Sequence, residues 1–123
     1  MRDRVQLMER REVDELVILD IAATPHNRGP RFNEVEELCS NLFMPVTVGG
    51  GVKTIADIRR LLASGADKVA INTAAWDTPD IITTASRKFG SQAVVVAVDA
   101  DKDGMVTTHC GSKVHTIGAM EWA

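Results

Sequence analysis

Glycines follow one apolar segment of the chain and an asparagine–threonine pair follows the next, and both could bind an anion. The segment 45–49, PVTVG, runs directly into Gly50 and Gly51. Glycine lets the backbone approach an anion closely and turn its N–H groups toward it, and a following helix adds the positive end of its dipole. A tight turn without a ligand is the alternative, but three glycines in a row favour a phosphate site. Asn72 and Thr73 could donate to the same anion, or they could cap an ordinary turn.

Two aspartates stand at the ends of other apolar segments. Asp20 lies near the end of the segment 15–21, and Asp99 ends the segment 93–99. Carboxylates at the carboxyl ends of parallel strands face the usual active-site rim of α/β proteins. We therefore take both as candidate catalytic residues that exchange protons with a substrate. For each of them the alternative is a turn or helix-capping aspartate.

Other polar clusters do not indicate metal or nucleotide chemistry. The segment 99–104, DADKDG, opens like a calcium loop, but its twelfth position is Cys110 and a strand precedes it, so a hairpin turn fits better. His109, Cys110 and His115 lack zinc spacing and a fourth ligand. The glycine segment matches neither common nucleotide-binding motif. We expect no metal and no cofactor.

Four short segments rich in valine and isoleucine predict buried parallel strands, because they are continuously apolar rather than alternating. They span residues 15–21, 45–49, 68–72 and 93–99. Apolar residues at helical spacing predict helices between them, within 32–42, 54–62 and 78–89.

Capping residues support these boundaries. Thr54 with Asp57 predicts a capping box, and Thr78 before Pro79 predicts the next helix start. Further helices are expected at 4–11 and 116–122, and a hairpin at 102–104.

The alternation of strands and helices fits either a small doubly wound sheet or part of a (β/α)₈ barrel. A complete barrel takes roughly 250 residues, and this chain has 123. If the chain is barrel-like, we expect half of a (β/α)₈ barrel with about four βα units. Such a half-barrel exposes two strand edges and an apolar inner face, which predicts either completion by self-association into a homo-oligomer or a missing partner.

Composition and charge limit the class of protein and the cellular compartment that we expect. A net charge of −3 does not suit a nucleic-acid binder, and no apolar stretch approaches the length of a membrane span. The N-terminus lacks the apolar centre of a signal peptide. Two cysteines cannot form a disulfide framework. We expect a cytoplasmic protein with reduced thiols.

Four segments in the same order resemble the cyclase subunit of imidazole glycerol phosphate synthase, a family of histidine biosynthesis. They are DELVILDIAA (14–23), MPVTVGGGV (44–52), GADKVAINTAA (65–75) and FGSQAVVVAVDA (89–100). The FMP at 43–45 is also similar to a paralogue linked to amidation of surface-polysaccharide sugars. The resemblance implies a (β/α)₈ barrel whose second to fifth strands this chain matches. Residues 1–123 then form a single half-barrel domain.

The resemblance also implies an activity. In the family, ammonia from a glutaminase partner reacts with a phosphoribulosyl-formimino aminoimidazole carboxamide ribonucleotide, and two aspartates act as general acid and base. Asp99 matches one of them, and nothing in this sequence matches the other. Gly51, Asn72 and Thr73 match one of the family's two phosphate sites.

At the opposite end of the barrel, the resemblance implies contacts with the glutaminase. Glu15 and Lys68 match the ammonia entrance, and Asp67 and Gln92 match the subunit interface. The expected function is that of a half-barrel cyclase relative with one phosphate site and one catalytic aspartate, inactive by itself. One alternative is an active ammonia-dependent cyclase or sugar-amidation component completed by a partner. The other is a non-catalytic oligomeric binding or scaffold module.

Overall fold

The computed structural model describes residues 2–123. The helices are α1 (Arg2–Arg10), α2 (Phe32–Cys39), α3 (Ile55–Ala63), α4 (Thr73–Asp77), α5 (Asp80–Phe89) and α6 (Ala119–Trp122), with a short 3₁₀ helix η1 (Ser91–Ala93). The strands are β1 (Leu16–Leu19), β2 (Val46–Gly49), β3 (Lys68–Ile71), β4 (Val94–Val96), β5 (Asp99–Ala100), β6 (Met105–Thr108) and β7 (Lys113–Gly118).

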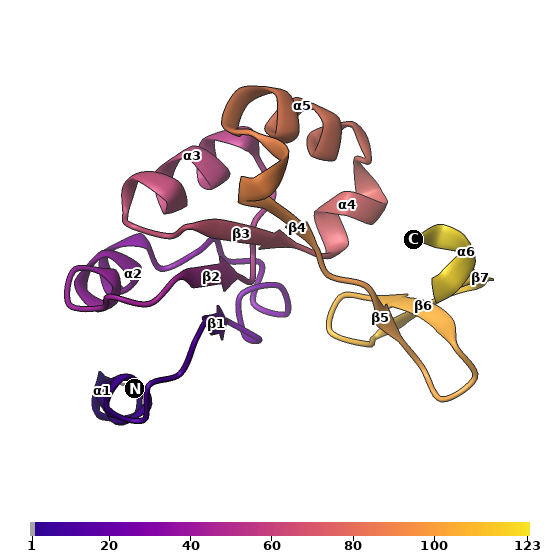
Figure 1. Cartoon of the computed structure of the whole chain (residues 1–123). Helices are drawn as coiled ribbons and strands as arrows, with labels where there is room; N and C mark the ends of the chain where they lie inside the picture. Colours follow the sequence, from indigo (N-terminus) through magenta and orange to yellow (C-terminus); the bar gives the residue numbers. More distant parts are fainter. Residues whose placement is uncertain (1) are drawn as a thin grey trace.

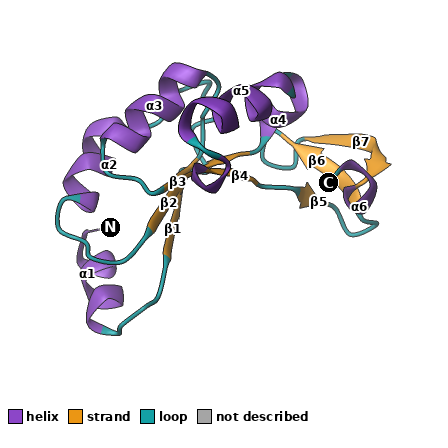
Figure 2. Ribbon diagram, turned by 45° about the horizontal axis from the view of Figure 1, so that its top comes forward, coloured by secondary structure: helices purple, strands orange, loops and turns teal. Residues whose placement is uncertain are grey.

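The first four strands form one parallel sheet in the order β1-β2-β3-β4. The register places Leu19 opposite Gly49, and Gly49 opposite Ala70. Helices α2, α3 and α5 arch over one face of this sheet (Figures 1 and 2). This is the arrangement of half a (β/α)₈ barrel, and it confirms the predicted fold class. A doubly wound sheet, with helices on both faces, does not describe it.

Alternation along the strands separates a helix-covered face from a bare one. The side chains of Val46, Val48, Val69 and Ile71 join the main apolar core, at most 3% exposed. Because side chains point to opposite faces in turn, the intervening residues face away from the helices. On β1 these are Val17, 59% exposed, and Leu19, 54% exposed. The inner face of the half-barrel is therefore apolar and open in this chain, as predicted.

The C-terminal quarter forms a second sheet, antiparallel, in the order β5-β6-β7. The predicted hairpin at 102–104 is present between β5 and β6. The predicted strand 93–99 is too long, because β4 ends at Val96 and the chain turns into β5 at Asp99. The helix predicted at 116–122 is present but begins later than predicted. Residues 113–118 pair with β6, and α6 starts at Ala119.

Of the two predicted helix caps, one is confirmed and one is wrong. The capping box is confirmed, because the Thr54 hydroxyl accepts from the Asp57 N–H and the Asp57 carboxylate accepts from the Thr54 N–H. The predicted Thr78 cap is wrong, since Pro79 occupies the N-cap of α5 and no side chain bonds there. No sequence pattern predicts α4, a five-residue helix that follows β3.

Candidate functional site

A cavity of about 470 Å³ opens at the carboxyl ends of the parallel strands. Its wall brings together residues from five separate segments of the chain. Among them are all six residues predicted from the sequence as catalytic or phosphate-binding: Asp20, Gly50, Gly51, Asn72, Thr73 and Asp99. The segment that follows each parallel strand therefore contributes to one shared cavity, as parallel-strand geometry predicts.

The three glycines each meet a different steric demand. A Cβ at Gly49 would lie 2.8 Å from Leu19 Cδ2 and 2.9 Å from Ala70 Cβ. Gly50 has φ 102°, and a Cβ there would overlap the carbonyl oxygen of Asp20. Gly51 has φ 70°, with Arg28 O only 2.6 Å from the position of a Cβ. The glycine loop is thus packed directly against the loop that follows β1.

Backbone N–H groups of this loop remain available to an anion. In the part of the chain that the structure describes, no hydrogen bond uses the N–H of Gly50 or Gly51. The N-terminus of α3, however, is already occupied by Asp57, whose Oδ2 accepts from the N–H of Lys53 at 3.0 Å and of Thr54 at 3.1 Å. The helix dipole expected to attract the anion is therefore largely satisfied by this carboxylate. Gly50 and Gly51 line the cavity, whereas Thr54 at the start of α3 does not.

Asn72 links the predicted phosphate site to the predicted catalytic aspartate. Its Nδ2 donates to Asp99 Oδ2 at 2.7 Å. Asp99 itself is exposed and begins β5 rather than ending β4. The amide nitrogen has two hydrogens, so one remains for a ligand beside the carboxylate.

The hydroxyl group of Thr73 also has a hydrogen that remains available to a ligand. Its Oγ1 accepts from the backbone N–H of His109 at 3.0 Å. Because the oxygen acts as the acceptor in this bond, the hydroxyl hydrogen is free to point elsewhere. The bond also ties the turn between β6 and β7 to the wall of the cavity.

Asp20 is held by two arginines of the following loop. Arg28 Nη1 lies 2.7 Å from Asp20 Oδ2, and Arg31 Nε lies 3.6 Å from the same oxygen. The hydrogen bond from Arg28 holds the pKa of Asp20 below its usual range, against the opposing effect of partial burial, and Asp20 in turn raises the pKa of Arg28. A carboxylate with a lowered pKa is a weak base. Asp20 is therefore suited to ordering its loop more than to carrying protons.

Sequence reasoning missed several residues of the cavity wall. Lys53 lies there with Asn27, and Lys53 Nζ donates to Asn27 Oδ1 at 2.5 Å. Its position two residues after the last glycine was the available signal. His109 and Cys110 also line the cavity. Their spacing in the sequence excludes a zinc site but does not indicate a place in this cavity, because they are distant in sequence from the parallel strands.

The four residues expected to contact a glutaminase lie at the other end of the strands. Lys68 Nζ and Glu15 Oε1 form an ion pair at 3.9 Å. The carboxylate of Asp67 accepts from the N–H of Val46 at 2.8 Å, which joins it to the start of β2. Gln92 is exposed in η1. The Glu15–Lys68 pair, Asp67 and Gln92 are therefore separated from the cavity by the length of the parallel strands.

Both cysteines are free thiols, and burial raises the pKa of Cys39. Within residues 2–123 there is no cluster of three or more histidine, cysteine or acidic side chains placed to hold a metal ion. No helix in the same range is both long and apolar enough to cross a bilayer.

The predicted site residues lie where (β/α)₈-barrel proteins bind their ligands, which defines the class of protein. Comparison with known proteins gives the family. Residues 2–123 match the family described as histidine biosynthesis protein, and the chain belongs to it.

Two relatives carry the name imidazole glycerol phosphate synthase subunit HisF. The chain is 47% identical to the one from Dehalococcoides mccartyi over 117 residues, 93% of this chain and 46% of the relative. It is 54% identical to the one from Dictyoglomus thermophilum over 96 residues, 78% of this chain and 38% of the relative. The resemblance drawn from the four sequence segments is thus confirmed. The chain spans less than half the length of these relatives.

Proposed function

We propose that this chain binds a phosphorylated small molecule in the cavity at the carboxyl ends of β1–β4, as half of a cyclase-type active site. The observation that carries the proposal is the convergence of unpaired glycine N–H groups, Asn72, Thr73 and Asp99 on one basin. Inorganic phosphate is the minimal ligand of such a site. The names of the relatives indicate the same ligand class, since both refer to a glycerol phosphate product.

The anion is bound chiefly by hydrogen bonds from neutral groups. Gly50 and Gly51 supply backbone N–H donors, Asn72 its second amide hydrogen and Thr73 its hydroxyl. Lys53 adds a positive charge at the rim, and no carboxylate pairs with it among the ion pairs of residues 2–123. A charge-assisted hydrogen bond contributes about 1.5–3 kcal/mol, so a few of them suffice for millimolar or tighter binding.

Asp99 is the residue to which we assign proton transfer. It is exposed to the cavity, and its only side-chain partner among the described residues is the Asn72 amide, which fixes the orientation of the carboxylate. Asp20 was the other sequence candidate, and its ion pair with Arg28 gives it the role of holding the loop beside Gly50. One acid–base group typically contributes 10²–10⁴-fold to a rate, so a chain with Asp99 alone is expected to be inactive in isolation.

A glutaminase subunit is the partner that the far end of the sheet favours. The Glu15–Lys68 ion pair there belongs to the inner face, where a small neutral molecule such as ammonia would enter. Asp67 and Gln92 stand outside it as contact residues. With that partner and the remaining barrel strands supplied, the chain is a component of an ammonia-dependent cyclase, which is our second candidate function.

The open inner face supports self-association as well. Val17 and Leu19 expose more than half of their side chains to solvent there, at a cost of about 25 cal/mol for each Å² of apolar surface. A second copy covering this face forms the homo-oligomer expected from the sequence. A scaffold module without catalysis would use the same association and leave the cavity without a ligand.

The test is a calorimetric titration of the full chain with inorganic phosphate and with glycerol phosphate. We expect binding in the micromolar to millimolar range, weakened at least tenfold in Thr73→Val. Gly29→Ala is the matched control, because a Cβ at Gly29 contacts nothing within 4 Å. Unchanged binding in Thr73→Val, or no heat at 10 mM ligand (a concentration of about 10⁻² M, where even a weak site is occupied), refutes the phosphate site.

Catalysis is tested separately by ammonia-dependent turnover, alone and with a glutaminase subunit added. Asp99→Asn is the variant that must abolish any rate. A rate that survives this change removes Asp99 from the mechanism.

A further inference from the structure

Two histidines share one hydroxyl behind the cavity. Thr108 Oγ1 lies 2.9 Å from His109 Nδ1 and 2.9 Å from His115 Nε2. Thr108 is 2% exposed, so solvent water does not reach the hydroxyl freely. His109 lines the cavity, whereas His115 does not. The proposed function makes no use of this cluster.

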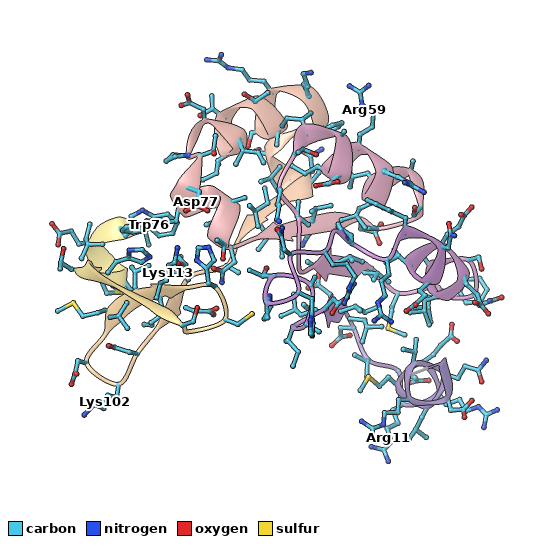
Figure 3. The ribbon with its side chains drawn as sticks, turned by 180° about the vertical axis from the view of Figure 1, so that it is seen from behind. Arg11, Arg59, Trp76, Asp77, Lys102 and Lys113 are labelled. Carbon is cyan, nitrogen blue, oxygen red and sulfur yellow. The ribbon has the colours of Figure 1, made fainter. Side chains whose placement is uncertain are left out.

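The cluster is fixed to the parallel half of the molecule from two sides. Trp76 of α4 stacks on His115, with ring centroids 3.8 Å apart and planes inclined by 25°. Figure 3 shows Trp76 between α4 and the three-stranded sheet. The backbone N–H of His109 bonds to Thr73, and Cys110 Sγ donates to Ile21 O at 3.3 Å. The turn between β6 and β7 is therefore held against the cavity by contacts with both the start of α4 and the loop after β1.

Proton counting limits what the cluster can do. The hydroxyl has one hydrogen, so it can donate to only one of the two imidazole nitrogens. In one neutral arrangement His115 donates from Nε2, Thr108 donates to His109 Nδ1, and His109 carries its hydrogen on Nε2. When His109 is doubly protonated, its Nδ1–H donates to Thr108 and the hydroxyl turns to donate to His115 Nε2. Each of these arrangements satisfies every bonded atom.

A second proton is not accommodated in the same way. With both rings charged, Thr108 accepts twice and its own hydrogen loses its acceptor in a site that is 2% exposed. An unsatisfied buried donor is costly, and two cations sharing one oxygen repel each other. The hydrogen-bond geometry therefore has a partner for every donor when His109 alone is charged, and lacks one when both rings are charged.

We propose that His109 is a proton-dependent contact of the anion in the cavity, and that Thr108 and His115 are positioning residues which allow it to carry the proton. This rests on the proposed anion site. His109 lines the cavity and in its charged form carries a hydrogen on Nε2, and among the hydrogen bonds of residues 2–123 none uses that nitrogen. Anion binding then draws a proton onto His109, and affinity rises as the pH falls.

Other titratable groups border the same space and must be separated from His109. They are Asp20, Lys53, Asp77, Asp99 and Cys110 in the cavity wall, with His115 behind it. Histidine is the side chain whose ordinary pKa places its charge change between about pH 5 and 8. Sulfate keeps the same charge over that range, whereas phosphate does not. Sulfate is therefore the probe that isolates the protein's own protonation.

The experiment measures sulfate affinity of the full chain at pH 8 and at pH 5.5. Wild-type protein is expected to bind about tenfold more tightly at the lower pH, the gain from one charge-assisted hydrogen bond. His109→Asn is expected to remove this gain in sulfate affinity. Asparagine tolerates the left-handed backbone at this position, where φ is 54°. His115→Phe keeps the stack on Trp76 and reduces the gain, because the hydroxyl then has no acceptor when His109 is charged.

His26→Gln is the control, since His26 is exposed and outside the cavity wall. It is expected to retain the full gain, and circular dichroism confirms that each variant is folded. A pH-dependent gain that persists in His109→Asn overturns the inference and leaves the anion site standing. Absence of both sulfate and phosphate binding by the wild type at either pH overturns the anion site and the His109 role together.

Discussion

Substitution of Gly51 by alanine separates the structural demand on the glycine loop from its ligand chemistry. Gly51 has φ 70°, a conformation that costs an ordinary residue about 1–2 kcal/mol. A Cβ there would also stand 2.6 Å from Arg28 O and 2.7 Å from Ala23 Cβ. The first neighbour is backbone, so the loop after β1 must shift as a whole, at about 1–3 kcal/mol for an overpacked site.

The two costs together predict that Gly51→Ala lowers the free energy of unfolding by about 2–5 kcal/mol. Urea denaturation followed by circular dichroism measures this directly. Gly29→Ala is the control in the facing loop, where a Cβ has open space and φ is not in the left-handed region. It is expected to change stability by at most about 0.5–1 kcal/mol, in either direction.

Equal stability of the two variants would refute the steric reasoning, because it would mean that the two loops do not interlock at Gly51. If Gly51→Ala is destabilised and still binds phosphate with wild-type affinity, the glycines serve the turn alone. If binding is lost while the variant remains folded, the backbone at this position contributes to the anion site.

Four other changes test separate parts of the structure. Arg28→Gln removes the bond that lowers the pKa of Asp20. That bond's stabilisation is complete above the ordinary value of 3.8 and is lost as pH falls through the lower folded-state pKa, so the variant should lose stability at pH 7 and show a higher Asp20 pKa by NMR titration. Thr54→Ala breaks the capping box and should cost about 1 kcal/mol in urea unfolding. Leu61→Ala, at a fully buried site, should cost about 2–5 kcal/mol. Leu19→Ser on the bare face should leave the unfolding free energy of the monomer nearly unchanged and weaken self-association in sedimentation velocity; unaltered sedimentation would contradict the proposed oligomer face.

The parallel half of the fold was predictable because its signals are local and redundant. Each strand is a continuous apolar run, and the helix α3 has both a capping box and an apolar stripe. Parallel-strand geometry then placed Asp20, Gly51 and Asn72 at one end of the sheet without any further information. The resemblance supplied the barrel and excluded the doubly wound alternative.

The antiparallel half was harder, because its signals depend on partners distant in sequence. No residue of strand β7 is buried, and the strand pairs with β6 across a turn of left-handed residues, so no buried apolar run marks it. Its neighbour α4 is only five residues long and lacks a side-chain cap. The place of His109 in the cavity depends on both elements, and this is why the sequence pointed to histidines without indicating their role.

The one-sided packing of the parallel sheet has a consequence for engineering this chain. Residues that set stability, such as Ile58 and Val69, lie between the sheet and its helices, whereas Thr47 and Val95 alternate onto the opposite face. A combinatorial library at the second pair would vary the lining of the half-barrel while leaving the packed layer untouched. Directed evolution could therefore search for new ligands or new assembly partners without first having to repair the fold.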